Sequence, residues 1–202
     1  MIILIRNRLS ILLTERGLKA TQVANATGIA RSTLSKISNN SSEKIDYSTI
    51  NALCNCLKIT PCEFFEYSPI DISFRFELGD ILTSKKDYDQ GVPYTTEAFG
   101  FINFSKYDEK IGFIEFEGYV EDYGPYVTKN EYIYSQVVRI HPIADPSSLL
   151  DQLSITFQTD IKEKYMKFVV DTLEEQDSST LGDDESIDYS VNISFEMKPT
   201  NN

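Results

Sequence analysis

The sequence predicts two domains of different class: an all-α domain of five short helices in residues 1–67, and an α+β domain in residues 68–202. Apolar residues recur at helical spacing as far as Phe65 and at alternate positions after it. Charge divides at the same place. Residues 1–62 hold eight Lys and Arg against three Asp and Glu, whereas residues 63–202 hold eleven against twenty-eight. This asymmetry indicates two surfaces with different partners, because a basic surface can approach phosphate and an acidic one is repelled by it.

The N-terminal helices are predicted from amphipathic stripes. In the first helix, apolar residues at positions 5, 9, 12 and 13 fall on one face. The second helix turns Val23 and Ala24 inward, and the third turns Leu34 and Ile37 inward. We expect helices over residues 2–16, 20–27, 31–38 and 46–57, and a short fifth helix that starts at residue 60.

Capping residues set the expected ends of these helices. Gly17 ends the first helix, and Gly28 supplies the tight turn between the second and third. Asp46 is a good N-cap for the fourth helix. The segment Thr60–Glu63 combines an N-cap Thr, a Pro at the first helical position and a Glu that completes a capping box. Five short helices with a glycine turn between the second and third are therefore expected.

The stretch Leu18–Phe65 resembles the helix-turn-helix of the Cro/phage-repressor (XRE) superfamily. The matching segments are Gly17-Leu18, Val23-Ala24, Gly28-Ile29, Arg31–Ile37 and Leu57–Pro61. The resemblance covers about a third of the chain. It implies a sequence-specific transcriptional regulator of the phage- or mobile-element type, a repressor that binds double-stranded operator DNA as a homodimer.

By this resemblance the third helix is the recognition helix, which enters the major groove, while the second lies across the DNA backbone. Arg31 can donate two hydrogen bonds to O6 and N7 of guanine, worth ~1–3 kcal/mol of discrimination. Lys36, one turn later, can reach a base edge or a phosphate. The base-reading residues are expected to be Arg31, Ser32, Ser35 and Lys36.

Phosphate contacts are expected from the flanking loop and from the start of the second helix, where they set the register on DNA without reading sequence. The N-cap of the second helix is Lys19, where the family usually has Ser or Thr, and Ala20 stands where it often has Gln. Lys19 can replace that contact electrostatically. The expected phosphate-contacting residues are Lys19, Thr21, Gln22, Thr33, Asn39, Asn40, Ser41 and Lys44.

Three cysteines, Cys54, Cys56 and Cys62, lie in one short stretch, and the single histidine, His141, is far away in sequence. This pattern fits neither a disulfide framework nor a structural zinc site. We interpret Cys54 and Cys56 as packing residues. No metal and no cofactor are predicted.

The second domain is predicted from period-two alternation, clearest at residues 72–78 and 187–197. Further strands are expected near 99–104, 111–120 and 132–140, and helices from Pro146 and around residues 161–173. Strands, helices and a last strand predict an antiparallel sheet with helices packed on one face.

The function of the second domain stays open among three roles. It lacks the Ala-Gly dipeptide that a LexA-like self-cleaving domain needs, and it has no Cys and no Gly-rich phosphate loop. We therefore expect no enzyme. Dimerisation is the first role. The alternative is an autorepressing helix-turn-helix fused to an acidic protein-binding domain, a nucleic-acid mimic or an inhibitor of CRISPR nucleases. A small-molecule sensor is the third, because aromatic sheets often line pockets.

We expect no signal for secretion or membrane insertion at the N-terminus. The apolar run of residues 1–5 is followed at once by Arg6 and Arg8, far short of the ~18 apolar residues of a membrane span. We expect a cytoplasmic protein with no membrane contact.

Overall fold

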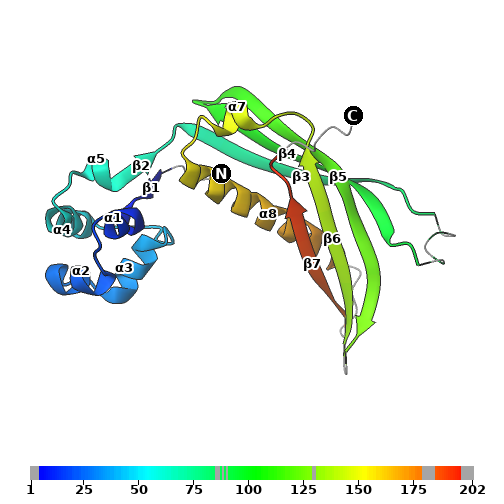
Figure 1. The fold of residues 1–202 in the computed structure, drawn as a ribbon, viewed down its shortest axis with the longest axis horizontal. Helices are drawn as coiled ribbons and strands as arrows, with labels where there is room; N and C mark the ends of the chain where they lie inside the picture. The colour runs from blue at the N-terminus through cyan, green and yellow to red at the C-terminus, as the bar shows by residue number, and fades with distance from the viewer. Residues whose placement is uncertain are drawn as a thin grey trace. The chain divides into compact units, whose positions relative to one another are not determined.

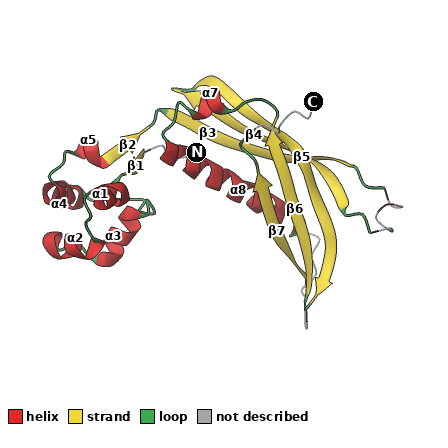
Figure 2. Cartoon of the chain, viewed as in Figure 1, coloured by secondary structure: helices red, strands yellow, loops and turns green. Residues whose placement is uncertain are grey.

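The structure is a computed structural model that describes residues 5–84, 87, 89, 91–128, 131–178 and 185–196. The chain divides between Pro69 and Ile70 into two compact units, here called the N-terminal unit and the C-terminal unit (Figure 1). The first holds short helices and the second most of the strands (Figure 2).

The N-terminal unit contains four helices of seven to eleven residues, one single-turn helix and a two-stranded antiparallel sheet. The elements are β1 (Ile5–Asn7), α1 (Leu9–Glu15), α2 (Ala20–Thr27), α3 (Arg31–Ser38), α4 (Tyr47–Leu57), α5 (Pro61–Phe64) and β2 (Phe65–Tyr67). The predicted α2 and α3 have the bounds seen in the structure.

The prediction of a helix from residue 2 was wrong at its start, where residues 2–4 lie outside the described part. Ile5 lies in β1 opposite Tyr67 of β2, and its side chain is 52% exposed instead of facing the core. Backbone pairing with a segment some sixty residues away outweighs the helical spacing of Ile5 from Leu9. An apolar residue at helical spacing from a stripe is therefore not sufficient evidence that the helix includes it.

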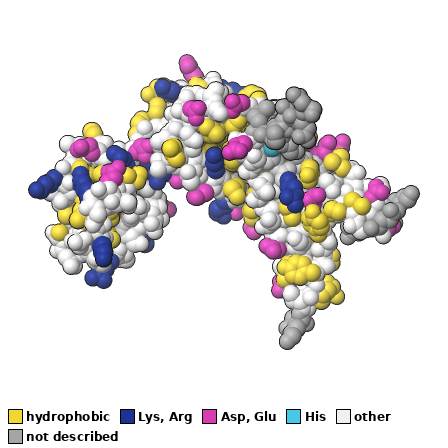
Figure 3. Space-filling model, viewed as in Figure 1, with side chains coloured by type: hydrophobic (Ala, Val, Ile, Leu, Met, Phe, Trp, Pro, Cys, Tyr) yellow, Lys and Arg dark blue, Asp and Glu magenta, His cyan; other side chains and the backbone are white. Residues whose placement is uncertain are grey.

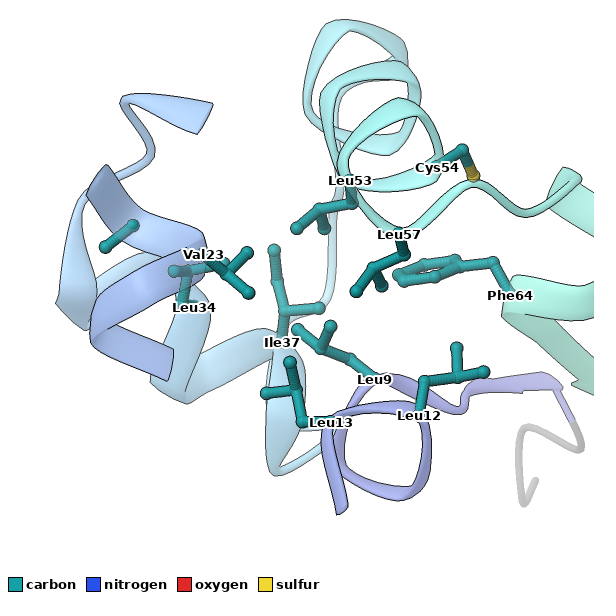
Figure 4. Close-up of a cluster of buried hydrophobic side chains, with 11 residues drawn as sticks. Leu9, Leu12, Leu13, Val23, Leu34, Ile37, Leu53, Cys54, Leu57 and Phe64 are labelled. Atoms are coloured by element: carbon teal, nitrogen blue, oxygen red, sulfur yellow. The ribbon is translucent and has the colours of Figure 1, made fainter. Parts of the chain in front are cut away.

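The core of the N-terminal unit forms where the apolar stripes of the helices converge (Figure 4). Leu9, Leu34, Leu53 and Phe64 are at most 1% exposed. Each such side chain contributes ~1.5–3 kcal/mol by leaving water. Cys54 is buried in this cluster and Cys56 packs against it, which confirms their interpretation as packing residues. Burial raises the pKa of the Cys54 thiol.

The C-terminal unit is built on a five-stranded sheet in the order β3-β4-β5-β6-β7. Its strands are β3 (Ile70–Ile81), β4 (Tyr94–Lys106), β5 (Glu109–Val127), β6 (Tyr132–Pro142) and β7 (Glu185–Ile193), and its helices include α7 (Ser147–Leu150) and α8 (Ile155–Asp177). The first four strands form an antiparallel meander, whereas β7 pairs with β6 in parallel.

The predicted fold class was wrong for this unit, because the sheet is mixed and strands rather than packed helices dominate the domain. The physical reason is the connection between β6 and β7. It contains the 23-residue helix α8, which at 1.5 Å per residue spans roughly 35 Å. A helix of this length carries the chain back to the end of the sheet where β6 began, and β7 then starts in the same direction as β6.

Helix α8 packs on the sheet through Tyr165, which is fully buried. Its ring lies 5.1 Å from that of Phe74 on β3 and 5.3 Å from that of Phe116 on β5, measured between centroids. Gly100 on β4 lies directly beneath. A Cβ at this position would stand 1.9 Å from the Tyr165 hydroxyl oxygen, so the close approach requires glycine.

Among the helices in the described ranges, none combines the length and the apolar character that a membrane span needs.

Candidate DNA interface

The turn between α2 and α3 depends on Gly28. Its φ of 74° lies in the left-handed region that favours glycine, and its N–H donates to the carbonyl of Ala24 at 2.9 Å. The chain then enters α3 through Ala30. Val23 of α2 and Leu34 and Ile37 of α3 are each at most 2% exposed, which holds the two helices against one core. The local sequence at Gly28 therefore determines the turn, and the burial of Leu34 and Ile37 determines which face of α3 points towards solvent.

Because Leu34 and Ile37 face inward, the opposite face of α3 projects into solvent. That face contains all the predicted base-reading residues, and each is exposed: Arg31, Ser32, Ser35 and Lys36. Thr33 is exposed as well. The N-cap residue Ala30 offers no side-chain acceptor to the first-turn N–H groups of α3. Such groups can donate to an anion or a base edge.

The C-terminal end of α3 is held by a pair of asparagines, here called the Asn7–Asn40 clasp. The Asn7 side chain donates to the Ile37 carbonyl and to Oδ1 of Asn40, each at 2.7 Å. The Asn7 N–H donates to the same Oδ1 at 2.8 Å, and the Asn40 amide donates back to the Asn7 carbonyl at 3.1 Å. Asn40 adopts a φ of 51° to do this. The clasp therefore ties β1 to the C-terminal end of α3.

Sequence reasoning missed Asn7. It lay inside the predicted first helix, whereas in the structure its Oδ1 accepts from the N–H of Leu9, 3.0 Å away, at the start of α1. Asn7 stands one residue before the N-cap Arg8, and its contact with the Leu9 N–H is that of an Asx turn. Asparagine is a common residue in such turns, and this was the available signal. Asn7 is 5% exposed, and its side chain holds the end of α3 instead of facing solvent.

The loop after α3 divides into residues that end the helix and residues that project. Asn40 has its amide in the clasp, and Ser41 donates its hydroxyl to the Lys36 carbonyl at 3.1 Å while its N–H donates there at 2.9 Å. Asn39, at the C-cap, and Lys44 are exposed. All four predicted loop residues are therefore exposed, and Asn40 and Ser41 also use their side chains to hold the end of α3.

At the start of α2, Lys19, Thr21 and Gln22 are all exposed. Lys19 occupies the N-cap, and its N–H donates to Oε1 of Gln22 at 2.8 Å. This contact holds the Gln22 side-chain amide at the first turn of α2. The amide oxygen accepts the bond, so the amide nitrogen can still donate to another group. Gln22, three positions after Lys19, thus supplies one half of a capping box. The Lys19 side chain is a donor only and cannot accept from the Gln22 N–H, which would be the other half.

The two units differ in net charge, as the sequence indicates, because residues 1–62 hold more Lys and Arg than Asp and Glu and residues 63–202 hold the reverse. In the face drawn in Figure 3, charged side chains of both signs are visible on each unit. Among the described residues, no group of three or more His, Cys, Asp or Glu side chains is arranged to hold a metal ion.

Comparison with known proteins agrees with this geometry. Residues 8–69 match the family model described as the Cro/C1-type HTH DNA-binding domain. Searches of curated proteins and of solved structures find no match to the chain. The matched region begins at Arg8, directly before α1, and includes α2, the Gly28 turn and α3. The N-terminal third of this DNA-binding regulator is therefore a Cro/C1-type helix-turn-helix DNA-binding domain.

Proposed function

We propose that the chain is a sequence-specific transcriptional repressor of the phage- or mobile-element type. It binds operator DNA as a dimer, reads bases with Arg31, Ser32, Ser35 and Lys36 of α3, and uses residues 68–202 for association rather than catalysis. One recognition helix contacts few base pairs, so two half-sites about one helical turn apart are needed for useful affinity.

The observation that carries this proposal is the exposed face of α3 within a Cro/C1-type domain. Phosphate contacts are assigned to side chains that project around it: Lys19, Thr21, Gln22, Thr33, Asn39 and Lys44. For Asn40 and Ser41 a phosphate contact has to coexist with their bonds to Asn7 and Lys36.

The test is selection of a binding site by the full chain from a randomised duplex pool, followed by titration of the selected duplex. Arg31→Ala is expected to weaken binding about 5- to 150-fold and to relax the preference at one base pair, because it removes a bidentate base contact. Lys44→Ala is expected to weaken all duplexes equally and to lower the slope of log K against log salt by about one.

Lys164→Ala is the matched control, since Lys164 is an exposed cation on α8 of the C-terminal unit. It should change neither the preference nor the slope. The assignment of α3 as the reading helix is wrong if Arg31→Ala and Lys164→Ala bind the selected duplex equally well. The proposal as a whole fails if no sequence is enriched and binding shows no salt dependence.

A second candidate function is binding of a basic protein partner by the C-terminal unit. Its support is the face of the sheet away from α8. Phe116 packs on Tyr165 of α8, so its neighbours Glu115 and Glu117 project from the other face. Capture from a host lysate with the full chain, and with a Glu115→Gln/Glu117→Gln variant, tests this. A partner retained equally by both proteins would contradict the assignment to this face.

A further inference from the structure

A row of polar side chains interrupts the apolar face of the sheet near the C-terminal end of α8. Asp122 on β5 lies directly opposite Gln136 on β6, and Gln136 pairs with Tyr189 on β7. Tyr189 donates its hydroxyl to Oδ2 of Asp177, the last residue of α8, at 2.8 Å. Directly opposite residues project from the same face of a sheet, so Asp122 and Gln136 point towards α8 as well.

The side-chain amide of Gln136 is hydrogen-bonded at one end. Its nitrogen donates to Oδ2 of Asp177 at 3.3 Å, and this contact fixes the orientation of the amide, because a carboxylate accepts hydrogen bonds. The amide oxygen, Oε1, is buried, and no group in the described part of the chain donates to it. A buried acceptor without a donor destabilises a fold, so Oε1 needs a donor from a neighbouring group.

Asp122 can supply that donor only in its protonated form. An ionised carboxylate has no hydrogen to donate, whereas a carboxylic acid donates one O–H. Oδ1 of Asp122 accepts from the Gly124 N–H at 2.7 Å, so Oδ2 is the oxygen that can carry the proton. Burial, opposed by the Gly124 bond and helped by the charge of Asp177, raises the pKa of Asp122 above its ordinary 3.8. The form that satisfies Gln136 is therefore the form that this environment favours.

The elements packed around Asp122 oppose a negative charge there. At the α8-facing positions of β4, β6 and β7 nearest to Asp122, the described residues include no Lys, Arg or His. The last turn of α8 holds no basic residue either, and the C-terminal end of a helix carries partial negative charge of its own. The titratable groups on this side of the neighbouring elements are Tyr94 on β4, Tyr134 on β6, Glu185 and Tyr189 on β7, and Glu174 and Asp177 on α8.

We propose that Asp122, Gln136 and Asp177 form a proton-dependent latch that holds the C-terminal end of α8 on the sheet. In the closed state the Asp122 O–H donates to Oε1 of Gln136, while the Gln136 amide and the Tyr189 hydroxyl donate to Asp177. When Asp122 releases its proton to solvent, the first bond is lost and a second negative charge stands near Asp177. The end of α8 and β7 then open locally. This latch responds to pH whether or not the chain binds DNA, so it goes beyond the proposed function.

The direct test is an NMR titration of the full chain from pH 8 down to pH 4, following the Asp122 carboxyl carbon and the Gln136 side-chain amide. Both should shift with one midpoint above 3.8. In Asp122→Asn the Gln136 signals should not depend on pH, since asparagine donates at every pH. Asp188→Asn is the matched control, an exposed acid on β7 that should leave the Gln136 titration unchanged. An Asp122 that stays ionised down to pH 4, or a Gln136 that does not follow it, overturns the latch.

Opening is measured by hydrogen–deuterium exchange, corrected for the intrinsic effect of pH. On going from pH 4 to pH 8, protection of residues 170–177 and 185–193 should fall about tenfold for each unit by which the folded pKa of Asp122 exceeds the unfolded one. Asp122→Asn should keep its protection at pH 8. Tyr189→Phe removes a donor to Asp177 without removing a titrating carboxyl, so it should lower protection equally at both pH values.

Three results of the exchange experiment would each overturn the latch. The native chain could show equal protection at the two pH values, Asp122→Asn could lose protection with pH as the native chain does, or Tyr189→Phe could leave protection unchanged.

Discussion

Removal of the Asn7 side chain gives the sharpest test of how the C-terminal end of α3 is held. Asn7→Ala deletes three hydrogen bonds: two donated to the Ile37 carbonyl and to Oδ1 of Asn40, and one accepted from the Leu9 N–H. Because Asn7, Leu9 and Ile37 are buried, water cannot replace all of the lost partners.

The magnitude follows from which groups retain another partner. The Ile37 carbonyl still accepts from the Asn40 N–H, and Asn40 Oδ1 still accepts from the Asn7 N–H, so each of these losses costs only ~0.5 kcal/mol. The buried Leu9 N–H loses the side-chain acceptor that it has in the native chain, which costs ~1–3 kcal/mol. We expect the N-terminal unit to lose ~2–4 kcal/mol of unfolding free energy.

Hydrogen–deuterium exchange with peptide mass spectrometry reports on this unit alone, which matters because a chain with two units need not unfold in one step. Exchange of the slowest amides in α1 and α3 should accelerate about 30- to 1000-fold, since each 1.4 kcal/mol is a factor of ten. Asn39→Ala, an exposed substitution on the same helix end, should change exchange little. If Asn7→Ala exchanges within about threefold of the native chain, the clasp contributes no stability.

Two further predictions concern the C-terminal unit. Gly100→Ala forces a methyl group against the Tyr165 hydroxyl, so we expect a loss of ~1–3 kcal/mol in urea unfolding, and an unchanged midpoint would refute the packing of α8 on β4. Asp122→Asn tests charge burial. Desolvation, helped by the charge of Asp177 and opposed by the Gly124 N–H, raises the Asp122 pKa from its ordinary 3.8. Protonated Asp122 therefore adds to the free energy of unfolding at low pH. That contribution is lost as the pH rises through the raised pKa. The variant should be more stable than the native chain at pH 7, with the gain shrinking towards pH 4, and equal urea midpoints at pH 7 would contradict the burial of that charge.

Much of the N-terminal unit was predictable because its signals are local. The turn at Gly28 needs a left-handed backbone, and the spacing of Leu34 and Ile37 orients α3, so the bounds of α2 and α3 and the exposed face of α3 follow from about twenty residues. The strands of the C-terminal unit are also predictable from the alternation of apolar and polar residues, as at Phe74 and Phe76 in β3.

Tertiary structure decided the features that join distant segments. Ile5–Asn7 forms a strand because Phe65–Tyr67 is there to pair with it, although its spacing fits a helix. The clasp requires Asn7 and Asn40 to meet across thirty-three positions. Neither partner carries a local signal for the other.

The sequence by itself thus determined the Cro/C1-type helix-turn-helix of residues 8–69, since turn chemistry and periodicity act within a few residues. Only the tertiary structure decided that β7 runs parallel to β6 and ends the sheet. Strand direction depends on where α8 delivers the chain, and packing of Tyr165 over Gly100 places α8. That contact involves residues 65 positions apart in sequence, beyond the reach of any periodic pattern.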